Sequence, residues 1–203
     1  MSPSNSPTIK VPTPTNLPTT PPTKIPTTDP TQQPTLSPTA FKGNVYVQYY
    51  NAIGWFGIPS TGLSDLTPYK EEYIPLINYP LTSGTFAGSE KENNVAALFQ
   101  GRLLFEEQGE YLIKISCDYT FNFFFDGILV YKSLTAESVS FVGFFTPRST
   151  SLIGIEFFEM SGSSELVVSW LTPSSFDFVP IPEEAWKRVV SYYILVFNTF
   201  ELV

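Results

Sequence analysis

The side chains that could do chemistry in this chain are carboxylates, hydroxyls and one thiol, because its 203 residues include no histidine. Ser-His-Asp catalysis, Cys-His catalysis and histidine-ligated metal sites are therefore excluded. Paired carboxylates can hydrolyse glycosides, but no spacing singles out a pair among Glu106, Glu107, Glu110 and Asp118. The one thiol, Cys117, ends an expected strand without a histidine partner, so we expect a buried, small apolar side chain. These residues predict a protein that is not an enzyme.

A second chemical pattern is a Pro-Thr pair at every fourth residue near the start of the chain. The residues are Pro14, Thr15, Pro18, Thr19, Pro22, Thr23, Pro26, Thr27, Pro30, Thr31, Pro34, Thr35, Pro38 and Thr39. Proline fixes φ and removes a backbone donor, so we expect residues 1–40 to form an extended, polyproline-like tail. Long Pro/Thr tracts are typical of O-glycosylated stalks, which predicts covalent glycans or hydroxylation at these residues and an extracellular or cell-surface protein. An unmodified linker is the alternative.

The composition changes near Phe41, after which nearly all the aromatic residues occur. One tail and one domain is the simplest organisation, with the domain over residues 41–186 and an apolar segment over 187–203. The net charge is −8, with 19 acidic and 11 basic residues. This balance lacks the positive surface that nucleic acids require and argues against anionic membranes.

The candidate carboxylates and the thiol lie among short runs of residues that are typical of β-strands. Val45, Val47 and Tyr49 alternate with more polar positions, which predicts a strand. Residues 54–90 are rich in Gly, Pro, Ser and Thr and predict long loops with short strands. Further strands are expected about every ten residues, at 95–105, 110–116, 121–125, 128–131, 139–145, 152–159 and 166–171. Asp126-Gly127 between two apolar runs predicts a tight type I′ hairpin. This spacing predicts an all-β domain, a sandwich or a barrel.

The order of these motifs resembles the PA14 family and its fungal relatives, the GLEYA and flocculin-type domains. The stretch GNVYVQYYN (43–51) is similar to the opening strand of the family, and FQGRLLFEEQGEYLIKISCDYTFNFFFDGILVY (99–131) to its central passage. SLIGIEFFEMSGSSELVVSWLTP (151–173) and FVPIPEEAW (178–186) are similar to its last core strands and closing segment. The resemblance covers about residues 41–186. It implies an antiparallel β-sandwich used in extracellular carbohydrate or protein recognition.

The resemblance also implies where a metal would bind. Sugar-binding members carry two adjacent aspartates, which coordinate a calcium ion that holds sugar hydroxyls, and the matching pair here is Asp118-Tyr119. Asp118 is therefore the candidate metal ligand. Calcium prefers six to eight oxygen ligands, so a tyrosine in place of one aspartate argues against a required cofactor. The alternative roles are a loop hydrogen bond for Asp118 and a turn for Asp126.

The segment after Trp186 is apolar on both faces of a period-two pattern. Its candidate assembly residues are Val189, Val190, Tyr192, Tyr193, Ile194, Leu195, Val196 and Phe197. The run is too short to span a membrane. We expect a buried strand, paired either in its own sheet or with a neighbouring copy.

These features together support two functional hypotheses. The first is an extracellular structural glycoprotein, a homo-oligomer that assembles head to tail into a fibre or surface layer through its tail and terminal strand. The second is a stalked cell-surface adhesin or lectin that binds carbohydrate, with or without calcium.

Overall fold

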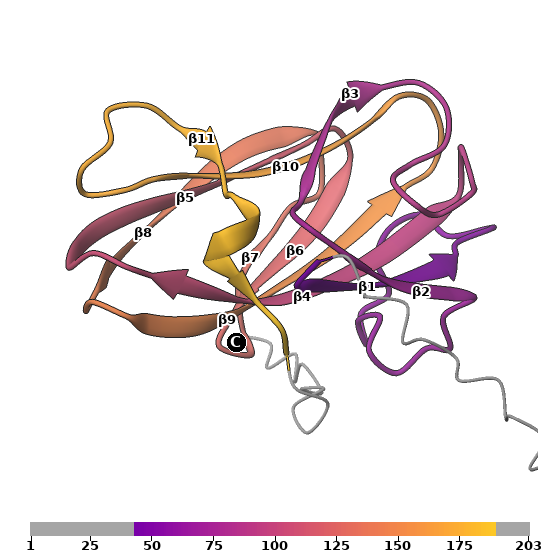
Figure 1. Cartoon of the computed structure of the whole chain (residues 1–203). Helices are drawn as coiled ribbons and strands as arrows, with labels where there is room; N and C mark the ends of the chain where they lie inside the picture. The colour runs from indigo at the N-terminus through magenta and orange to yellow at the C-terminus, as the bar shows by residue number, and fades with distance from the viewer. Residues whose placement is uncertain (1–42, 190–203) are drawn as a thin grey trace, which may run out of the picture. The chain divides into compact units, whose positions relative to one another are not determined.

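Residues 43–189 are the part of the chain that the computed structural model describes, and they are mostly β-structure (Figure 1). The strands are β1 (Val45–Asn51), β2 (Lys70–Ile74), β3 (Asn78–Thr82), β4 (Val95–Phe105), β5 (Gly109–Cys117), β6 (Thr120–Phe125), β7 (Ile128–Lys132), β8 (Glu137–Phe145), β9 (Ser149–Glu159), β10 (Ser164–Leu171), β11 (Val179–Pro180) and β12 (Trp186–Lys187). A 3-10 turn, η1 (Glu183–Ala185), precedes β12. The Pro/Thr tail and the terminal segment from Val190 to Phe197 lie outside the described residues, so both stay predictions.

The strands form two antiparallel sheets. The larger sheet has the order β2, β1, β4, β9, β6, β7, and β12 also pairs with β4. The smaller sheet has the order β11, β10, β5, β8, and β3 also pairs with β10. The all-β domain predicted from the spacing of the strands and the antiparallel sandwich implied by the family resemblance are therefore confirmed. Within residues 43–189, no helix is long and apolar enough to cross a membrane.

Alternating side chains place the main core between the sheets. In β1, Val45, Val47 and Tyr49 have no exposed surface, whereas their neighbours Tyr46 and Gln48 are half-buried. β4 and β9 pair along eleven residues each and form the centre of the larger sheet. A second apolar cluster lies on the other face of this sheet, where side chains of the loop over residues 52–66 pack against it. Because both faces of the sheet are covered, the sequences of its middle strands are nearly continuous runs of apolar residues.

The predicted hairpin joins β6 to β7. Phe125 pairs with Ile128 across the turn, and Asp126 and Gly127 have φ angles of 48° and 82°. Two positive φ angles are what a type I′ turn requires, so this prediction is confirmed. The turn fixes the register of the larger sheet at its β7 edge.

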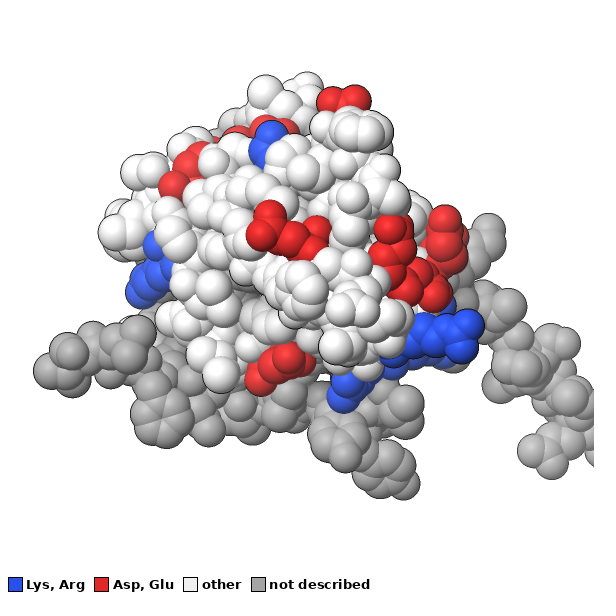
Figure 2. All heavy atoms as spheres, turned by 90° about the vertical axis from the view of Figure 1, so that its left-hand side faces the viewer, with Lys and Arg blue, Asp and Glu red and all other residues white. Residues whose placement is uncertain are grey.

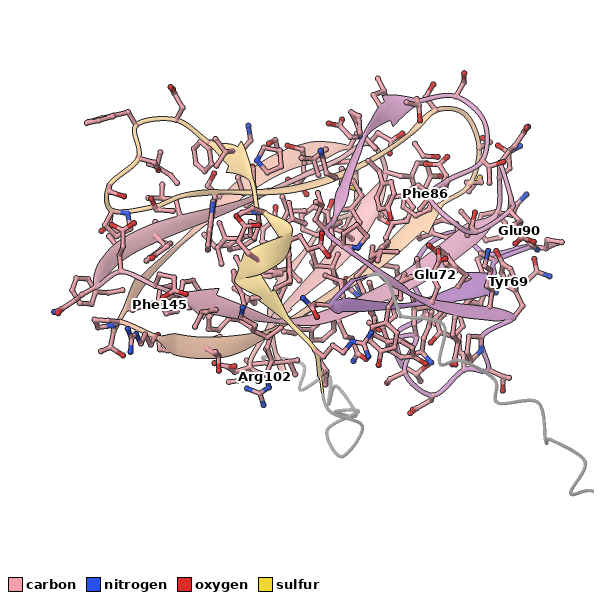
Figure 3. The ribbon with its side chains drawn as sticks, in the orientation of Figure 1. Tyr69, Glu72, Phe86, Glu90, Arg102 and Phe145 are labelled. Atoms are coloured by element: carbon pink, nitrogen blue, oxygen red, sulfur yellow. The ribbon has the colours of Figure 1, made fainter. Side chains whose placement is uncertain are left out.

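Polar contacts hold the loop between β3 and β4 at one end of the domain. Tyr69 donates a hydrogen bond of 2.7 Å to the Ser89 carbonyl, and Lys70 pairs with Glu90 at 2.6 Å. Figure 3 shows Tyr69, Glu72, Phe86 and Glu90 at this end and Phe145 at the other. The loop is thus attached to the start of β2 by the side chains of Lys70 and of Tyr69, the residue before the strand.

The described chain ends against the larger sheet. Trp186 is fully buried and pairs with Leu103 of β4. A Cβ atom on Gly101 would lie 2.7 Å from the Trp186 ring, so only glycine leaves room for this indole. Val189, the last described residue, is buried in the second apolar cluster.

Candidate functional site

Asp118, the predicted metal ligand, lies in the short connection between β5 and β6. Its Oδ1 accepts a 2.6 Å hydrogen bond from the backbone N–H of Glu165, and its own N–H donates to the Glu165 carbonyl at 3.4 Å. Burial raises the pKa of Asp118 above its usual range. Asp118 therefore fastens this connection to the start of β10.

A second carboxylate, Glu159, ends β9 near Asp118. Its side chain is fully buried, and within residues 43–189 neither carboxylate oxygen makes a hydrogen bond of normal geometry. Burial, together with the negative charge of Asp118, raises the pKa of Glu159 to about 7, and the backbone of Ser161 opposes the rise. The carboxyl group of Glu159 is thus half protonated near neutral pH.

These two carboxylates do not form a calcium site by themselves. Calcium prefers six to eight oxygen ligands, and among the described residues no group of three or more Asp, Glu, Cys or His side chains could hold a metal ion. Tyr119 packs edge-on against Phe158, with 5.4 Å between ring centroids, and its hydroxyl contacts the sulfur of Met160 at 3.8 Å. Tyr119 thus contributes to packing where the sugar-binding pattern has its second aspartate.

The other carboxylates considered from the sequence do not join Asp118. Glu106, Glu107 and Glu110 lie at the start of β5, and Asp118 follows its end, a strand of nine residues away. Nine residues of strand span about 30 Å, which is too far for paired acid–base chemistry. Asp126 Oδ1 accepts a 2.7 Å hydrogen bond from the Leu152 N–H, which accounts for its position in the turn.

Cys117 is buried, as predicted, with 3% of its surface exposed. Burial, together with the nearby carboxylates, raises the pKa of its thiol to about 12, and the backbone of Tyr119 opposes the rise. A thiol that stays protonated is a poor nucleophile, so Cys117 serves packing.

A polar pocket on the outer face of the larger sheet brings together residues that the sequence did not identify. Its volume is about 330 Å³. It lies between the loop over residues 52–66 and the strands β6 and β7. Its walls are formed by Phe56, Gly57, Ile58, Thr120, Asn122, Lys132, Ser133 and Leu134. A pocket of this size is at the lower end of the range for small-molecule sites.

A buried hydrogen-bond chain fixes the amide of Asn122 in this wall. Glu156 is fully buried, and its Oε1 accepts a 2.6 Å bond from the Leu63 N–H. Its Oε2 accepts a 2.8 Å bond from Asn122 Nδ2. Gly62 has φ of +78°, and a Cβ there would lie 2.7 Å from Glu156 Oε1, so glycine lets the loop approach the carboxylate. Because Glu156 occupies the amide nitrogen, the Oδ1 atom of Asn122 is left as an acceptor.

Two polar atoms of the pocket wall are buried without a partner. Within the described part of the chain, neither Thr120 Oγ1 nor Asn122 Oδ1 makes a hydrogen bond. Phe56 and Leu134, which line the same pocket, are 92% and 75% exposed. Leaving a buried polar atom unsatisfied costs about 1–3 kcal/mol, so such atoms beside a pocket point to a polar occupant.

No protein-family model and no curated protein sequence matches the chain. Several solved structures have the same fold. The PA14 domain of the MpAFP antifreeze protein superimposes with a TM-score of 0.59 at 11% identity, covering 71% of this chain and 90% of that domain. The Epithelial Adhesin 9 A domain from Candida glabrata, in complex with Galb1-3GlcNAc, superimposes with a TM-score of 0.58 at 8% identity, covering 71% of this chain and 88% of that domain. An anti-sigma factor domain-containing protein superimposes with a TM-score of 0.60 at 16% identity, and the match covers 73% of this chain. Our chain spans about half of that protein, 48% of its length.

The described domain has a PA14-like fold. The family resemblance found in the sequence therefore holds at the level of the fold.

In this PA14-like sandwich, Thr120 follows Asp118 by two residues and pairs with Phe158, the neighbour of Glu159. The polar pocket thus lies beside the loop that carries the predicted metal ligand. Sequence reasoning missed it, although one pattern pointed there: Asn122 and Glu156 are polar residues within apolar strand sequences, FNFFF and LIGIEFF. A polar residue inside such a run must be hydrogen-bonded in the core or serve a site.

Proposed function

We propose that residues 43–189 form a carbohydrate-binding domain of the adhesin type, acting at the cell surface or outside the cell. The observation that carries this proposal is the polar pocket, which is lined by Thr120 and Asn122 with their unpartnered oxygens and by the exposed residue Phe56. The PA14-like fold and the sugar complex of the adhesin A domain support it. The Pro/Thr tail would then serve as a stalk that carries the domain.

A saccharide matches the chemistry of this pocket because each of its hydroxyl groups both donates and accepts. Both oxygens are covered in the described structure, so once the covering side chains shift, Asn122 Oδ1 would accept from one hydroxyl and Thr120 Oγ1 would exchange hydrogen bonds with another. Lys132, which lies opposite Asn122 on β7, offers a donor. The exposed face of Phe56 would pack against the C–H groups of the sugar ring. Lys132 is the one charged residue among the described residues that line the pocket, and Glu156, which is hydrogen-bonded to Asn122 behind the wall, opposes its charge, so the site favours a neutral sugar.

The fibre hypothesis rests on residues 1–40 and 190–203. Both segments lie outside the described residues, so assembly into a fibre or surface layer, the covalent glycans and the head-to-tail contact stay predictions. Calcium is not needed for the hydrogen bonds proposed here. A glycan array with the full chain, read with and without EDTA, is the first experiment, and we expect glycan binding that EDTA does not abolish.

Two substitutions test the site itself. Phe56→Ala removes an exposed ring, and Thr120→Val replaces the unpartnered hydroxyl by a methyl group of the same shape. We expect each to weaken sugar binding about 5–30-fold, since one hydrogen bond or ring contact contributes about 1–2 kcal/mol. Thr120→Val should at the same time raise the free energy of unfolding by about 1 kcal/mol, because it removes a buried hydroxyl without a partner.

The controls separate binding from stability. Ser164 Oγ is also buried without a partner among the described residues, but it lies outside this pocket, so Ser164→Ala should stabilise the protein and leave binding unchanged. Phe176→Ala removes another ring that is 97% exposed and should change neither quantity. A wild-type chain that binds no glycan, or a Thr120→Val variant with full affinity, would overturn the proposal.

A further inference from the structure

The strand β8 forms an edge of the smaller sheet. Among the described residues it pairs only with β5, in a register that continues without a bulge from Glu137 to Phe145. In an antiparallel pair, about half of the N–H and C=O groups of an edge strand point away from its neighbour. β8 therefore presents a row of backbone groups that can pair with another strand.

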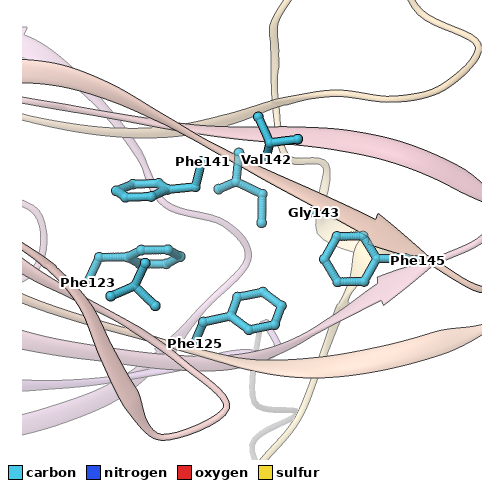
Figure 4. Close-up of a pocket in the computed structure, with 8 residues that line it drawn as sticks. Phe123, Phe125, Phe141, Val142, Gly143 and Phe145 are labelled. Carbon is cyan, nitrogen blue, oxygen red and sulfur yellow. The ribbon is translucent and has the colours of Figure 1, made fainter.

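The surface along this edge is apolar. On β8, Val142 and Phe144 are 65% and 71% exposed, and on the neighbouring edge strand β7, Ile128 and Val130 are 70% and 47% exposed. A slot of about 190 Å³ opens between these strands. Figure 4 shows the rings of Phe123 and Phe125 on one side of it and Phe141 on the other. Figure 2, which faces the side of the molecule where β8 is labelled in Figure 1, shows scattered charges separated by wide uncharged areas.

β8 lacks the features that usually protect an edge strand. Natural edges carry charged side chains, proline or a bulge, or are very short. β8 has nine residues, a regular register and one charge, Glu137, at its first position. A long, regular and apolar edge favours pairing with a further strand.

We propose that β8 pairs antiparallel with β8 of a second copy of this chain, about a two-fold axis that places Val142 opposite Val142 of the partner subunit. This register sets Phe141 opposite Gly143 of the partner subunit and Phe144 opposite Ser140 of the partner subunit. It also sets Phe145 opposite Val139 of the partner subunit, and an aromatic residue opposite a β-branched one is a favourable cross-strand pair. The contact is isologous, the arrangement of most soluble dimers.

We choose a second copy as the occupant because β8 itself is a matching strand: it is apolar and uncharged over residues 138–145, so two copies can pair there without bringing like charges together. Each chain has a net charge of −8, so two copies repel each other across most of their surfaces. Residues 138–145 carry no charge, and the proposed register leaves Glu137 beyond the paired residues. Self-pairing also joins equivalent faces, so the exposed apolar side chains of one copy meet those of the other.

Sedimentation of the full chain over about 1–500 µM tests the proposal. A single strand pair makes a small interface, so we expect a monomer–dimer equilibrium with a dissociation constant on the order of 10–100 µM. Val142→Lys would place two like charges at the axis and should leave a monomer throughout. Phe176→Lys, at an exposed residue between β10 and β11, should leave dimerisation unchanged. Melting temperatures of the two variants show whether both are folded, and a wild type that stays monomeric overturns the proposal.

Cross-linking tests the register. Val142→Cys puts two thiols opposite each other at the axis, and oxidation should link the copies in a disulfide. Ser138→Cys, on the same face of β8 but opposite residue 146 of the partner, should not cross-link. The native Cys117 is buried and should not interfere. Equal cross-linking of both variants would contradict the proposed pairing.

The other candidate for this edge is the apolar terminal segment of the chain. Ile194→Pro in the full chain removes a backbone donor from that segment. We expect the dimer to persist. Its loss in Ile194→Pro, with Val142→Lys also monomeric, would overturn the proposal and assign the β8 edge to the terminal segment.

Discussion

At the scale of single residues, hydrogen bonding distinguishes the buried polar groups that stabilise the fold from those that line the candidate site. Glu156 is fully hydrogen-bonded by Leu63 and Asn122, so it belongs to the structure. Thr120 Oγ1 and Asn122 Oδ1 have no partner in the described part of the chain, so they mark the pocket. The sequence showed that Asn122 and Glu156 interrupt apolar runs. It could not show which of them were paired, because the partners come from distant strands and loops.

Glu159 leads to a prediction about pH. Its pKa in the folded protein is about 7, above the ordinary value of about 4.3 for glutamate. The folded state therefore binds the proton more tightly than the unfolded state, and stability falls as pH rises between these two values. The expected slope is about 1.4 kcal/mol per pH unit for one such group. The raised pKa values of Asp118 and Glu156 act in the same direction.

Urea unfolding between pH 4.5 and 8 measures this dependence. Glu159→Gln cannot ionise and should flatten the slope, whereas Glu183→Gln, at an exposed carboxylate, should keep it. Stability that rises through this range in the wild type would show that the burial of Glu159 does not control the titration.

At the scale of elements, turn chemistry and polar side chains decide where the strands end. The Asp-Gly turn fixes the register of β6 and β7, and Asp126 also bonds the backbone of β9. The sequence predicted this hairpin and most strand limits to within a few residues, since local patterns determine both. The exposed apolar edge formed by β8 was not predicted, because a strand's sequence does not reveal whether a neighbour covers it.

Gly127 gives a prediction at this scale. Its φ of 82° is unfavourable for a residue with a Cβ, so Gly127→Ala should lower the free energy of unfolding by about 1–2 kcal/mol. Gly57→Ala is a matched control, because a Cβ at Gly57 would meet no atom within 4 Å. Thermal unfolding of both variants measures the difference. An equal effect of the two substitutions would show that the turn is not under conformational constraint.

At the scale of the whole molecule, two apolar layers stabilise the domain. One lies between the sheets, and the other lies beneath the loop over residues 52–66. The same loop supplies Phe56 to the pocket and Leu63 to Glu156. Packing and the proposed binding site therefore depend on one segment, which the sequence showed only as a loop rich in glycine and proline.

Trp186 gives a prediction for the whole domain. It is fully buried against Gly101 near the end of the described chain. Trp186→Ala should lower the free energy of unfolding by about 3–5 kcal/mol, the usual cost of removing a large core ring. Trp55→Ala removes a half-buried ring and should cost less. Urea unfolding provides the measurement, and a loss below about 1 kcal/mol for Trp186→Ala would show that this end of the chain is not part of the core.

The chemistry considered first in the sequence was that of carboxylates, hydroxyls and a thiol. The sequence by itself determined the absence of histidine chemistry, the β-rich domain, the Asp-Gly hairpin and the apolar role of Cys117, because composition and local periodicity are sufficient for each. Only the tertiary structure decided that Asp118 bonds Glu165 and that Glu106, Glu107 and Glu110 lie at the far end of β5. Only the tertiary structure showed the polar pocket and the open β8 edge. These features depend on contacts between residues far apart in the chain, which no local pattern records.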